Sequence, residues 1–118
     1  MTENPAPAPG WLVVQGRLRP DGDGDYLAYL AGTRPLLARH GGEVVAVGAG
    51  VESPHATAAW PINAVLRFPS VDAANAFLDD PDYRLLRQRH RDPAYDTLHL
   101  TVFAGRPPRF VPPSPDAP

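Results

Sequence analysis

The sequence contains no cysteine, and this absence removes several classes of chemistry. Without a thiol, the chain cannot form a disulfide, use a thiolate nucleophile or hold zinc through cysteine ligands. It also contains no lysine, so all 11 of its basic residues are arginine. A Schiff-base lysine is therefore excluded, and with it one class of covalent catalysis.

Long apolar runs and a strong charge of either sign are also missing. No stretch approaches the roughly 20 apolar residues that cross a bilayer, and the N-terminal TENPAPAPG lacks the features of a signal peptide. The 13 acidic and 11 basic residues give a net charge of −2 at pH 7, which attracts neither nucleic acid nor anionic lipid. We therefore expect a cytoplasmic protein that binds no nucleic acid and no membrane.

The composition that remains is that of a single globular domain. The chain has 118 residues, of which 43% are hydrophobic and 20% charged. Proline is concentrated at both ends, where it favours extended, solvated conformations. We expect a Pro-rich N-terminal arm at residues 1–9, one domain at 10–106 and a Pro-rich C-terminal tail at 107–118.

Four segments have the composition and alternation of β-strands, at 11–18, 43–50, 62–68 and 97–105. Between the first two, apolar and small residues recur at three- and four-residue spacing, which predicts a helix over 23–40. The members of this stripe are Tyr26, Leu30, Thr33, Leu37 and His40. Pro35 should kink or split that helix, and Gly41 or Gly42 should end it as a left-handed cap.

Two shorter helices are predicted before the last strand. Ser70 is the expected N-cap of a helix over 71–80, and Asp80 with Pro81 begins another that continues to about Arg91. The resulting order is β-α-β-β-α-β, with the second helix in two parts. This order is typical of a ferredoxin-like α+β fold with a four-stranded antiparallel sheet covered by helices on one face only.

Strand alternation divides the sheet into two different faces. One face is aliphatic and belongs under the helices. The other, called the open face below, mixes large apolar and polar side chains: Trp11, Val13, Gln15, Arg17, Asn63, Val65, Arg67, His99, Thr101 and Phe103. Because Trp, Val and Phe are rarely left in water together, and because twofold dimers are the commonest oligomers, we expect a homodimer in which two such sheets face each other.

Short motifs spread over roughly residues 10–105 point to a known family. They are Gly10-Trp11, Asp25-Tyr26 with Tyr29, His40-Gly41-Gly42, Trp60-Pro61, Phe68-Pro69-Ser70, Ala73-Ala74, Pro81-Asp82-Tyr83, Arg89-His90-Arg91 and Ala104-Gly105. With these motifs the chain resembles the domain-of-unknown-function 1330 family of the dimeric α/β-barrel superfamily. The resemblance implies the fold and the dimer, in a superfamily whose members carry out acid–base isomerisation, cyclisation or oxygenation.

The chain departs from the family pattern at one position and leaves another open. The family often has an acid directly before Phe-Pro-Ser, where this chain has Arg67. The family's arginine after the Pro-x-Tyr helix corresponds here to either Arg89 or Arg91.

Two residues are candidates for a catalytic role. His40 lies in the last turn of the first helix, where the helix dipole favours a protonated imidazole, so it is either a capping residue or a proton-transfer group. Tyr29 is either a core aromatic or a hydrogen-bond donor to a substrate carbonyl or enolate.

The candidates for substrate binding lie on the open face and in a loop. A guanidinium on the face shared with Trp11 and Phe103 needs a carboxylate partner or a bound anion, so Arg17 and Arg67 are either anion anchors or part of a water-filled interface. The remaining members of the predicted set are Asn63 and His99 on the same face, Glu52 and His55 in the long loop before the third strand, and Arg89. Solvated loop and helix surfaces remain the alternative for the last three. No histidine pair has the i, i+4 spacing of a zinc-binding helix, so we predict no metal site.

These features predict a small, cofactor-independent enzyme of isomerase, cyclase or lyase type. Its substrate would be a small organic acid or an enolisable carbonyl compound, and specialised metabolism is one setting in which we expect it to act. A non-catalytic ligand-binding or scaffold dimer and a cofactor-free monooxygenase stay open as alternatives.

Overall fold

The computed structural model describes residues 7–107, so residues 7–9 and 107 are the part of the predicted arms at 1–9 and 107–118 that it includes. The elements are β1 (Gly10–Leu18), α1 (Asp23–Arg39), β2 (Glu43–Gly48), β3 (Ile62–Phe68), α2 (Val71–Asp79), α3 (Pro81–Leu86), the π-helical turn η1 (Arg87–Arg91), α4 (Asp92–Ala94) and β4 (Tyr95–Ala104).

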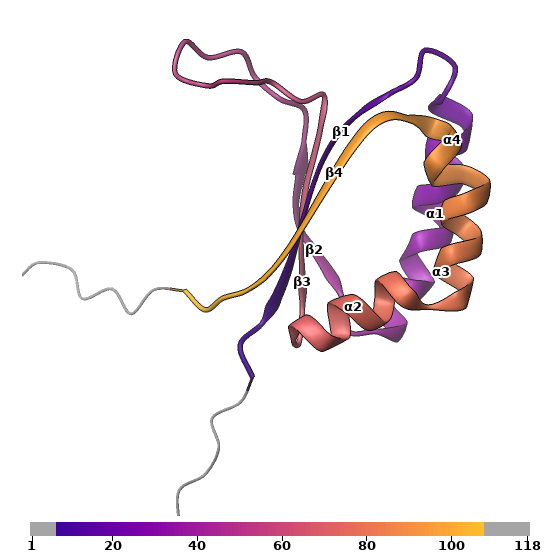
Figure 1. Cartoon of the computed structure of the whole chain (residues 1–118), viewed down its shortest axis with the longest axis vertical. Coiled ribbons are helices and arrows are strands. Elements are labelled where there is room, and N and C mark those ends of the chain that lie inside the picture. The colour runs from indigo at the N-terminus through magenta and orange to yellow at the C-terminus, as the bar shows by residue number, and fades with distance from the viewer. Residues whose placement is uncertain (1–6, 108–118) are drawn as a thin grey trace, which may run out of the picture.

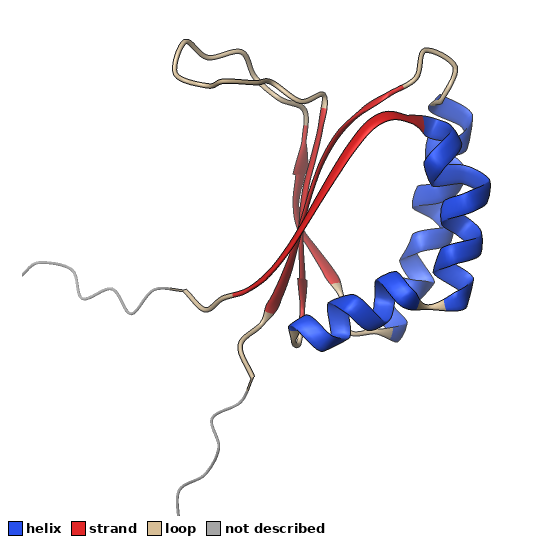
Figure 2. Ribbon diagram, in the orientation of Figure 1, coloured by secondary structure: helices blue, strands red, loops and turns tan. Residues whose placement is uncertain are grey.

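The predicted ferredoxin-like α+β architecture is confirmed. The four strands form one antiparallel sheet in the order β2-β3-β1-β4. The helices lie together on one side of it, and the other side carries no element of the described chain (Figures 1 and 2).

The core lies between the helices and the aliphatic face of the sheet. Its buried members are Leu12, Leu66 and Phe68 from the strands, Leu36 and Leu37 from α1, Ala74 and Phe77 from α2, and Tyr83 from α3. The cross-strand register places Trp11 beside Arg67 and Phe103, on the opposite face. The division of the strands into two faces, predicted from alternation, is therefore confirmed.

Pro35 does not split α1, which is one continuous segment of 17 residues. Proline removes the hydrogen bond to the carbonyl four residues earlier, here that of Ala31. Both Ala31 and Pro35 are exposed, so water can hydrate the freed carbonyl. Packing of the buried Leu36 and Leu37 after the proline keeps the last turn helical.

The predicted helix ends are confirmed. Gly41 has a φ of +71° and follows α1 as a left-handed residue, and the Gly42 amide donates to the Leu37 carbonyl at 2.8 Å. The Ser70 hydroxyl accepts from the Ala73 amide at 3.0 Å and caps α2. The Asp80 carboxylate accepts from the Asp82 amide at 2.9 Å and caps α3.

None of the helices in residues 7–107 has the length and apolarity that a bilayer crossing requires.

Candidate functional site

A cavity of about 360 Å³ lies between α1 and the aliphatic face of the sheet. Aliphatic side chains from all four strands form most of its wall, among them Leu12, Val44, Ala64 and Leu100. The polar groups are fewer and come mainly from the helices: Tyr26, Tyr29, Thr33, Arg34, Tyr83 and Tyr95. A mainly apolar wall with a few polar groups is typical of small-molecule sites, and the volume falls at the small end of their range.

One side of the cavity is less covered than the rest. Val44 and Val47 of β2 line it and are exposed, as is Leu30 of α1. Leu30 was predicted on the buried stripe of α1, and its exposure places it at the mouth of the cavity instead. The mouth therefore lies between α1 and the edge strand β2.

Three polar side chains form a chain of hydrogen bonds at the cavity wall. The Tyr29 and Tyr83 hydroxyl oxygens are 2.9 Å apart, and Arg91 Nη1 donates to the Tyr83 hydroxyl at 3.1 Å. The Arg91 guanidinium also lies over the Tyr83 ring, 5.8 Å from its centroid. Thr33 Oγ1 donates to the Tyr29 carbonyl at 2.6 Å and holds that turn of α1.

The tyrosines of the cavity are held in their neutral form. Burial raises the pKa of Tyr29 well above its ordinary value, and the neighbouring Tyr83 adds to the shift. Burial also raises the pKa of Tyr26 and of Tyr95, which meet edge to face with ring centroids 5.9 Å apart. Neutral phenols donate hydrogen bonds, so the polar wall can bind an oxygen acceptor.

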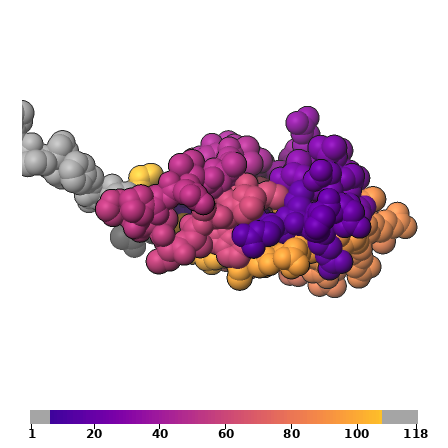
Figure 3. Space-filling model, turned by 90° about the horizontal axis from the view of Figure 1, so that it is seen from above, coloured from indigo at the N-terminus to yellow at the C-terminus, as the bar shows by residue number. Residues whose placement is uncertain are grey.

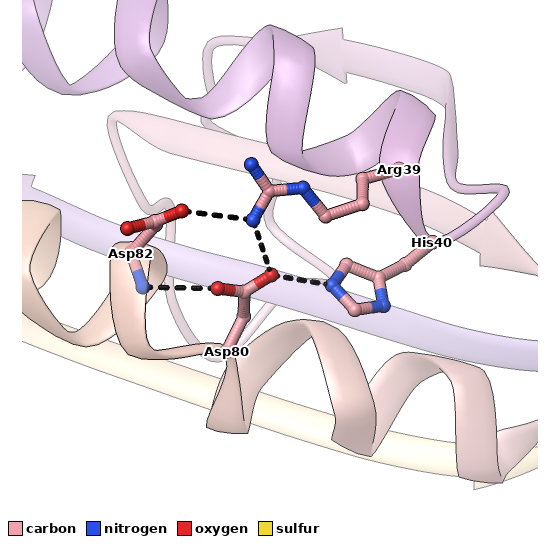
Figure 4. A network of polar contacts seen from close by, with 4 residues as sticks. All are labelled: Arg39, His40, Asp80 and Asp82. Atoms are coloured by element: carbon pink, nitrogen blue, oxygen red, sulfur yellow. Dashed lines mark hydrogen bonds and ion pairs between the residues drawn. The ribbon is translucent and has the colours of Figure 1, made fainter.

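His40 lies outside the residues that line this cavity. Its Nε2 is 2.7 Å from Asp80 Oδ2, and the same oxygen accepts from Arg39 Nη1 at 2.9 Å. Figure 4 shows Arg39 and His40 converging on Asp80, while Asp82 contacts Arg39 from the other side. The His40 ring meets Phe77 edge to face.

The pKa of Asp80 is lowered to about 2 by the hydrogen bond from His40, then by the Asp82 amide and Arg39. Asp80 is therefore an ionised, nearly buried carboxylate that joins the end of α1 to the start of α3. This geometry favours a structural role for His40, and its proton-transfer role stays a prediction.

The predicted open-face residues lie on the side of the sheet away from the cavity. Arg17 stacks over Trp60 with 5.6 Å to the ring centroid, and the Trp60 ring contacts His99 at 5.0 Å. Gln15 Nε2 donates to Asn63 Oδ1 at 3.3 Å. These residues form a connected polar and aromatic group, but the sheet separates them from Tyr29.

Arg67 forms a second group on the same face. Its guanidinium lies over the Trp11 ring at 5.9 Å from the centroid, and Trp11 stacks on Phe103. Glu43 is the cross-strand neighbour of Arg67 on β2.

Glu52 and His55 lie in the loop at 49–61, which projects away from the helices (Figures 1 and 3). Both residues are exposed, and the His55 amide donates to Ser53 Oγ. An open hollow of about 560 Å³ is bounded by residues of this loop alone, including Glu52. The loop is anchored only at its base, where the Gly50 amide donates to the Trp60 carbonyl.

Of the two arginines that the family pattern left open, Arg91 contacts the wall of the cavity. Its side chain is only 13% exposed and contacts Tyr83, whereas Arg89 is exposed on the outside of η1. Arg91 and Tyr83 were absent from the predicted site although both belong to family motifs. Arg34 was also missed, and its i, i+4 spacing from Leu30 could have placed it on the cavity side of α1.

Residues 7–107 contain no group of three or more His, Asp or Glu side chains that could hold a metal ion.

The fold and cavity define a ferredoxin-like α+β protein with a small-molecule-sized cavity beneath α1. The chain belongs to the family described as "Domain of unknown function (DUF1330)", which matches residues 11–105. This confirms the resemblance seen in the sequence motifs. No curated protein matches the chain.

Solved structures share the fold of this chain. The chain is 27% identical to the RPA0582 protein of unknown function from Rhodopseudomonas palustris, with a TM-score of 0.72 over 86% of this chain and 85% of that chain. It is 17% identical to a dimeric ferredoxin-like protein of unknown function from Thermobifida fusca, with a TM-score of 0.59 over 83% and 92%.

A third similar structure, from Bacteroides thetaiotaomicron, is named as a candidate antibiotic biosynthesis monooxygenase. It is 15% identical, with a TM-score of 0.57 over 85% of this chain and 90% of that chain. At 17% and 15% identity, the likeness to the proteins from Thermobifida fusca and Bacteroides thetaiotaomicron shows the fold alone.

Proposed function

We propose that this protein is a homodimeric, cofactor-independent enzyme that binds a small, mainly apolar carbonyl compound in the cavity beneath α1. Tyr29 would donate a hydrogen bond to the carbonyl oxygen and stabilise the enol or enolate. The observation that carries this proposal is the Arg91–Tyr83–Tyr29 hydrogen-bond chain at the wall of an apolar cavity.

In this proposal the chain of hydrogen bonds runs from Arg91 through Tyr83 to Tyr29, one of the two directions that the Tyr29–Tyr83 pair allows. A guanidinium can only donate, so the Tyr83 oxygen accepts from Arg91. The Tyr83 hydroxyl is then free to donate to the Tyr29 oxygen, 2.9 Å away. In this arrangement the Tyr29 proton remains for an acceptor in the cavity.

The surroundings of Tyr29 suit this task. Burial raises its pKa, so the phenol keeps its proton at neutral pH. A hydrogen bond in an apolar cavity is stronger than in water and stabilises the negative charge that develops on an enolate oxygen. The proton lost from the α-carbon would pass to water at the mouth beside β2.

The homodimer is proposed from the open face. Trp11 and Phe103 stack there, and Phe103 is 47% exposed in the single chain. A second copy packed on this face would cover both rings. The dimeric protein from Thermobifida fusca, which shares the fold, gives independent support.

The proposal is tested by deuterium exchange at the α-carbon of ketones and oxo acids, followed by NMR in deuterated water. Tyr29→Phe removes only the hydroxyl, and we expect it to slow protein-catalysed exchange about 100-fold, as for loss of one oxyanion donor. Tyr26→Phe is the matched control, because Tyr26 also lines the cavity but is not part of the Arg91–Tyr83–Tyr29 hydrogen-bond chain. Equal exchange by wild type and Tyr29→Phe would contradict the role of Tyr29.

A ligand-binding dimer without turnover is the second candidate. One observation favours it: among the described residues that line the cavity, none carries a carboxylate or an imidazole that could accept a proton. Tight ligand binding with no exchange above that of buffer would support it.

A cofactor-free monooxygenase is the third candidate. It is favoured by the name given to the Bacteroides thetaiotaomicron protein of the same fold. Oxygen consumption with an electron-rich aromatic substrate, measured with an oxygen electrode, would distinguish it from the isomerase-type reaction.

A further inference from the structure

Arg34 is the only charged residue among the described residues that line the cavity. It lies on α1 one turn after Leu30 and one turn before Leu37, and all three side chains line the same space. Since Leu30 and Arg34 are both exposed to some extent, the guanidinium belongs to the mouth and not to the floor.

The other arginines of the helical layer mostly have acidic partners. Arg39, Arg84, Arg87 and Arg91 each have a carboxylate oxygen within 4.0 Å. Within residues 7–107, Arg34 forms no such ion pair. A guanidinium beside an apolar cavity and without an ion pair is suited to bind an anion from solution.

We propose that the ligand of this cavity is a compact, apolar oxo acid whose carboxylate binds Arg34 while its carbonyl oxygen binds Tyr29. This inference rests on the function proposed above and specifies its substrate class. A single planar guanidinium matches a carboxylate through two parallel hydrogen bonds, whereas a phosphate dianion commonly recruits a second cation, and Arg34 is the one charged residue among the described residues of this wall.

The backbone positions of the two polar side chains also lie on different turns of α1. Tyr29 and Arg34 are five residues apart on α1, which corresponds to about 7.5 Å along the helix axis. The small volume and aliphatic walls leave room for a short apolar body between them, such as one ring. The carboxylate and the carbonyl therefore lie at opposite ends of the ligand.

Three rigid probes separate these contributions. Para-acetylbenzoate carries both groups, para-acetylbenzamide lacks the charge, and para-isopropylbenzoate lacks the carbonyl oxygen at nearly the same shape. Their dissociation constants for the full-length protein are measured by titration calorimetry at low ionic strength. The variants are Arg34→Gln, Arg34→Lys, Tyr29→Phe and, as the matched control, Arg89→Gln on the outside of η1.

We expect wild type to bind para-acetylbenzoate about tenfold more tightly than the amide, as for one partly solvated charge-assisted contact. Arg34→Gln should abolish this preference and leave the amide affinity unchanged, Arg34→Lys should restore part of it, and Arg89→Gln should keep it. A preference that survives in Arg34→Gln, or that is absent in wild type, would overturn the role of Arg34.

The comparison of para-acetylbenzoate with para-isopropylbenzoate, which lacks the carbonyl oxygen, tests the proposed function separately. If the two benzoates bind equally well and both still need Arg34, the anion site stands and the role of Tyr29 fails. If none of the three probes binds, the oxo-acid assignment fails together with the proposed function.

Discussion

Asp80 has two structural tasks at the residue scale. One carboxylate oxygen accepts from Arg39 and His40 at the end of α1, and the other caps α3 through the Asp82 amide. Its side chain is only 6% exposed, so these donors replace the water that an exposed carboxylate would bind. Losing the negative charge should therefore weaken the junction of the helices.

The pH dependence follows from the pKa of Asp80, which is about 2 in the fold and 3.8 ordinarily. Because folding lowers this pKa, the ionised group stabilises the fold above about pH 4, and the contribution is lost as the pH falls through about 2. Asp80→Asn keeps a capping residue but removes the charge. We expect the variant to unfold at a lower urea concentration than wild type at pH 7.

The difference between Asp80→Asn and wild type in the urea concentration at unfolding should become smaller as the pH approaches 2. Asp79→Asn is the control, because Asp79 is exposed and forms only a 3.4 Å contact with Arg84. If Asp80→Asn is less stable than wild type by the same amount from pH 7 to pH 2, the loss of the Asp80 charge is not the cause of the lower stability.

The sequence predicted the end of α1 at His40 and the start of α3 at Asp80, but not the contact between these two residues. Asp80 as a helix start and His40 as a helix end each follow from local rules. Their pairing depends on how α1 and α3 pack, across 40 residues of sequence, and no local pattern contains that information. Because this contact was not foreseen, the sequence alone suggested a proton-transfer role for the His40 imidazole.

At the scale of elements, η1 explains why the contact between Arg91 and Tyr83 could not be predicted from sequence. In an unbroken α-helix, residues eight positions apart are about 80° out of line. The π-helical turn has more residues per turn and rotates Arg91 back over Tyr83. Nothing in the sequence RQRHR indicates such a turn.

Pro35 gives a prediction for α1. The proline leaves one carbonyl of the helix without its partner, so Pro35→Ala should restore a hydrogen bond and raise the free energy of unfolding by about 1–3 kcal/mol. Urea denaturation measures this change. Pro20→Ala, in the turn before α1, has no helical bond to restore and should not stabilise the protein.

An unchanged or lower stability of Pro35→Ala would contradict this prediction. It would show that hydration of the Ala31 carbonyl, together with the lower conformational entropy that proline gives the unfolded state, already offsets the missing hydrogen bond.

At the scale of the whole molecule, the open face was the best-predicted feature. Strand alternation assigned Trp11, Arg67 and Phe103 to one surface, and the cross-strand register agrees. The cavity was not predictable in the same way. It arises because α1 leaves Val44 and Val47 of β2 partly uncovered, which depends on the placement of a helix over a sheet.

The proposed dimer predicts that a charge on the open face will separate the subunits. Phe103→Asp should shift the protein from dimer to monomer in sedimentation velocity at micromolar concentration, because an unpaired carboxylate would be buried between the sheets. Leu27→Asp is the matched control: Leu27 is 66% exposed on α1, away from that face.

Dissociation by both variants, or by neither, would contradict a dimer built on the open face. A circular dichroism spectrum matching wild type verifies that Phe103→Asp remains folded.

The edge strand β2 has a consequence for solubility. All six of its residues are exposed and three are valine, so its unpaired backbone resembles a template for fibril growth. The irregular pairing between Val44 and Ala46 places an extra residue in the strand and disrupts the regular ladder. Such an irregular edge is a poor template for a strand from another molecule, so we expect the bulge at Val45 to hinder aggregation.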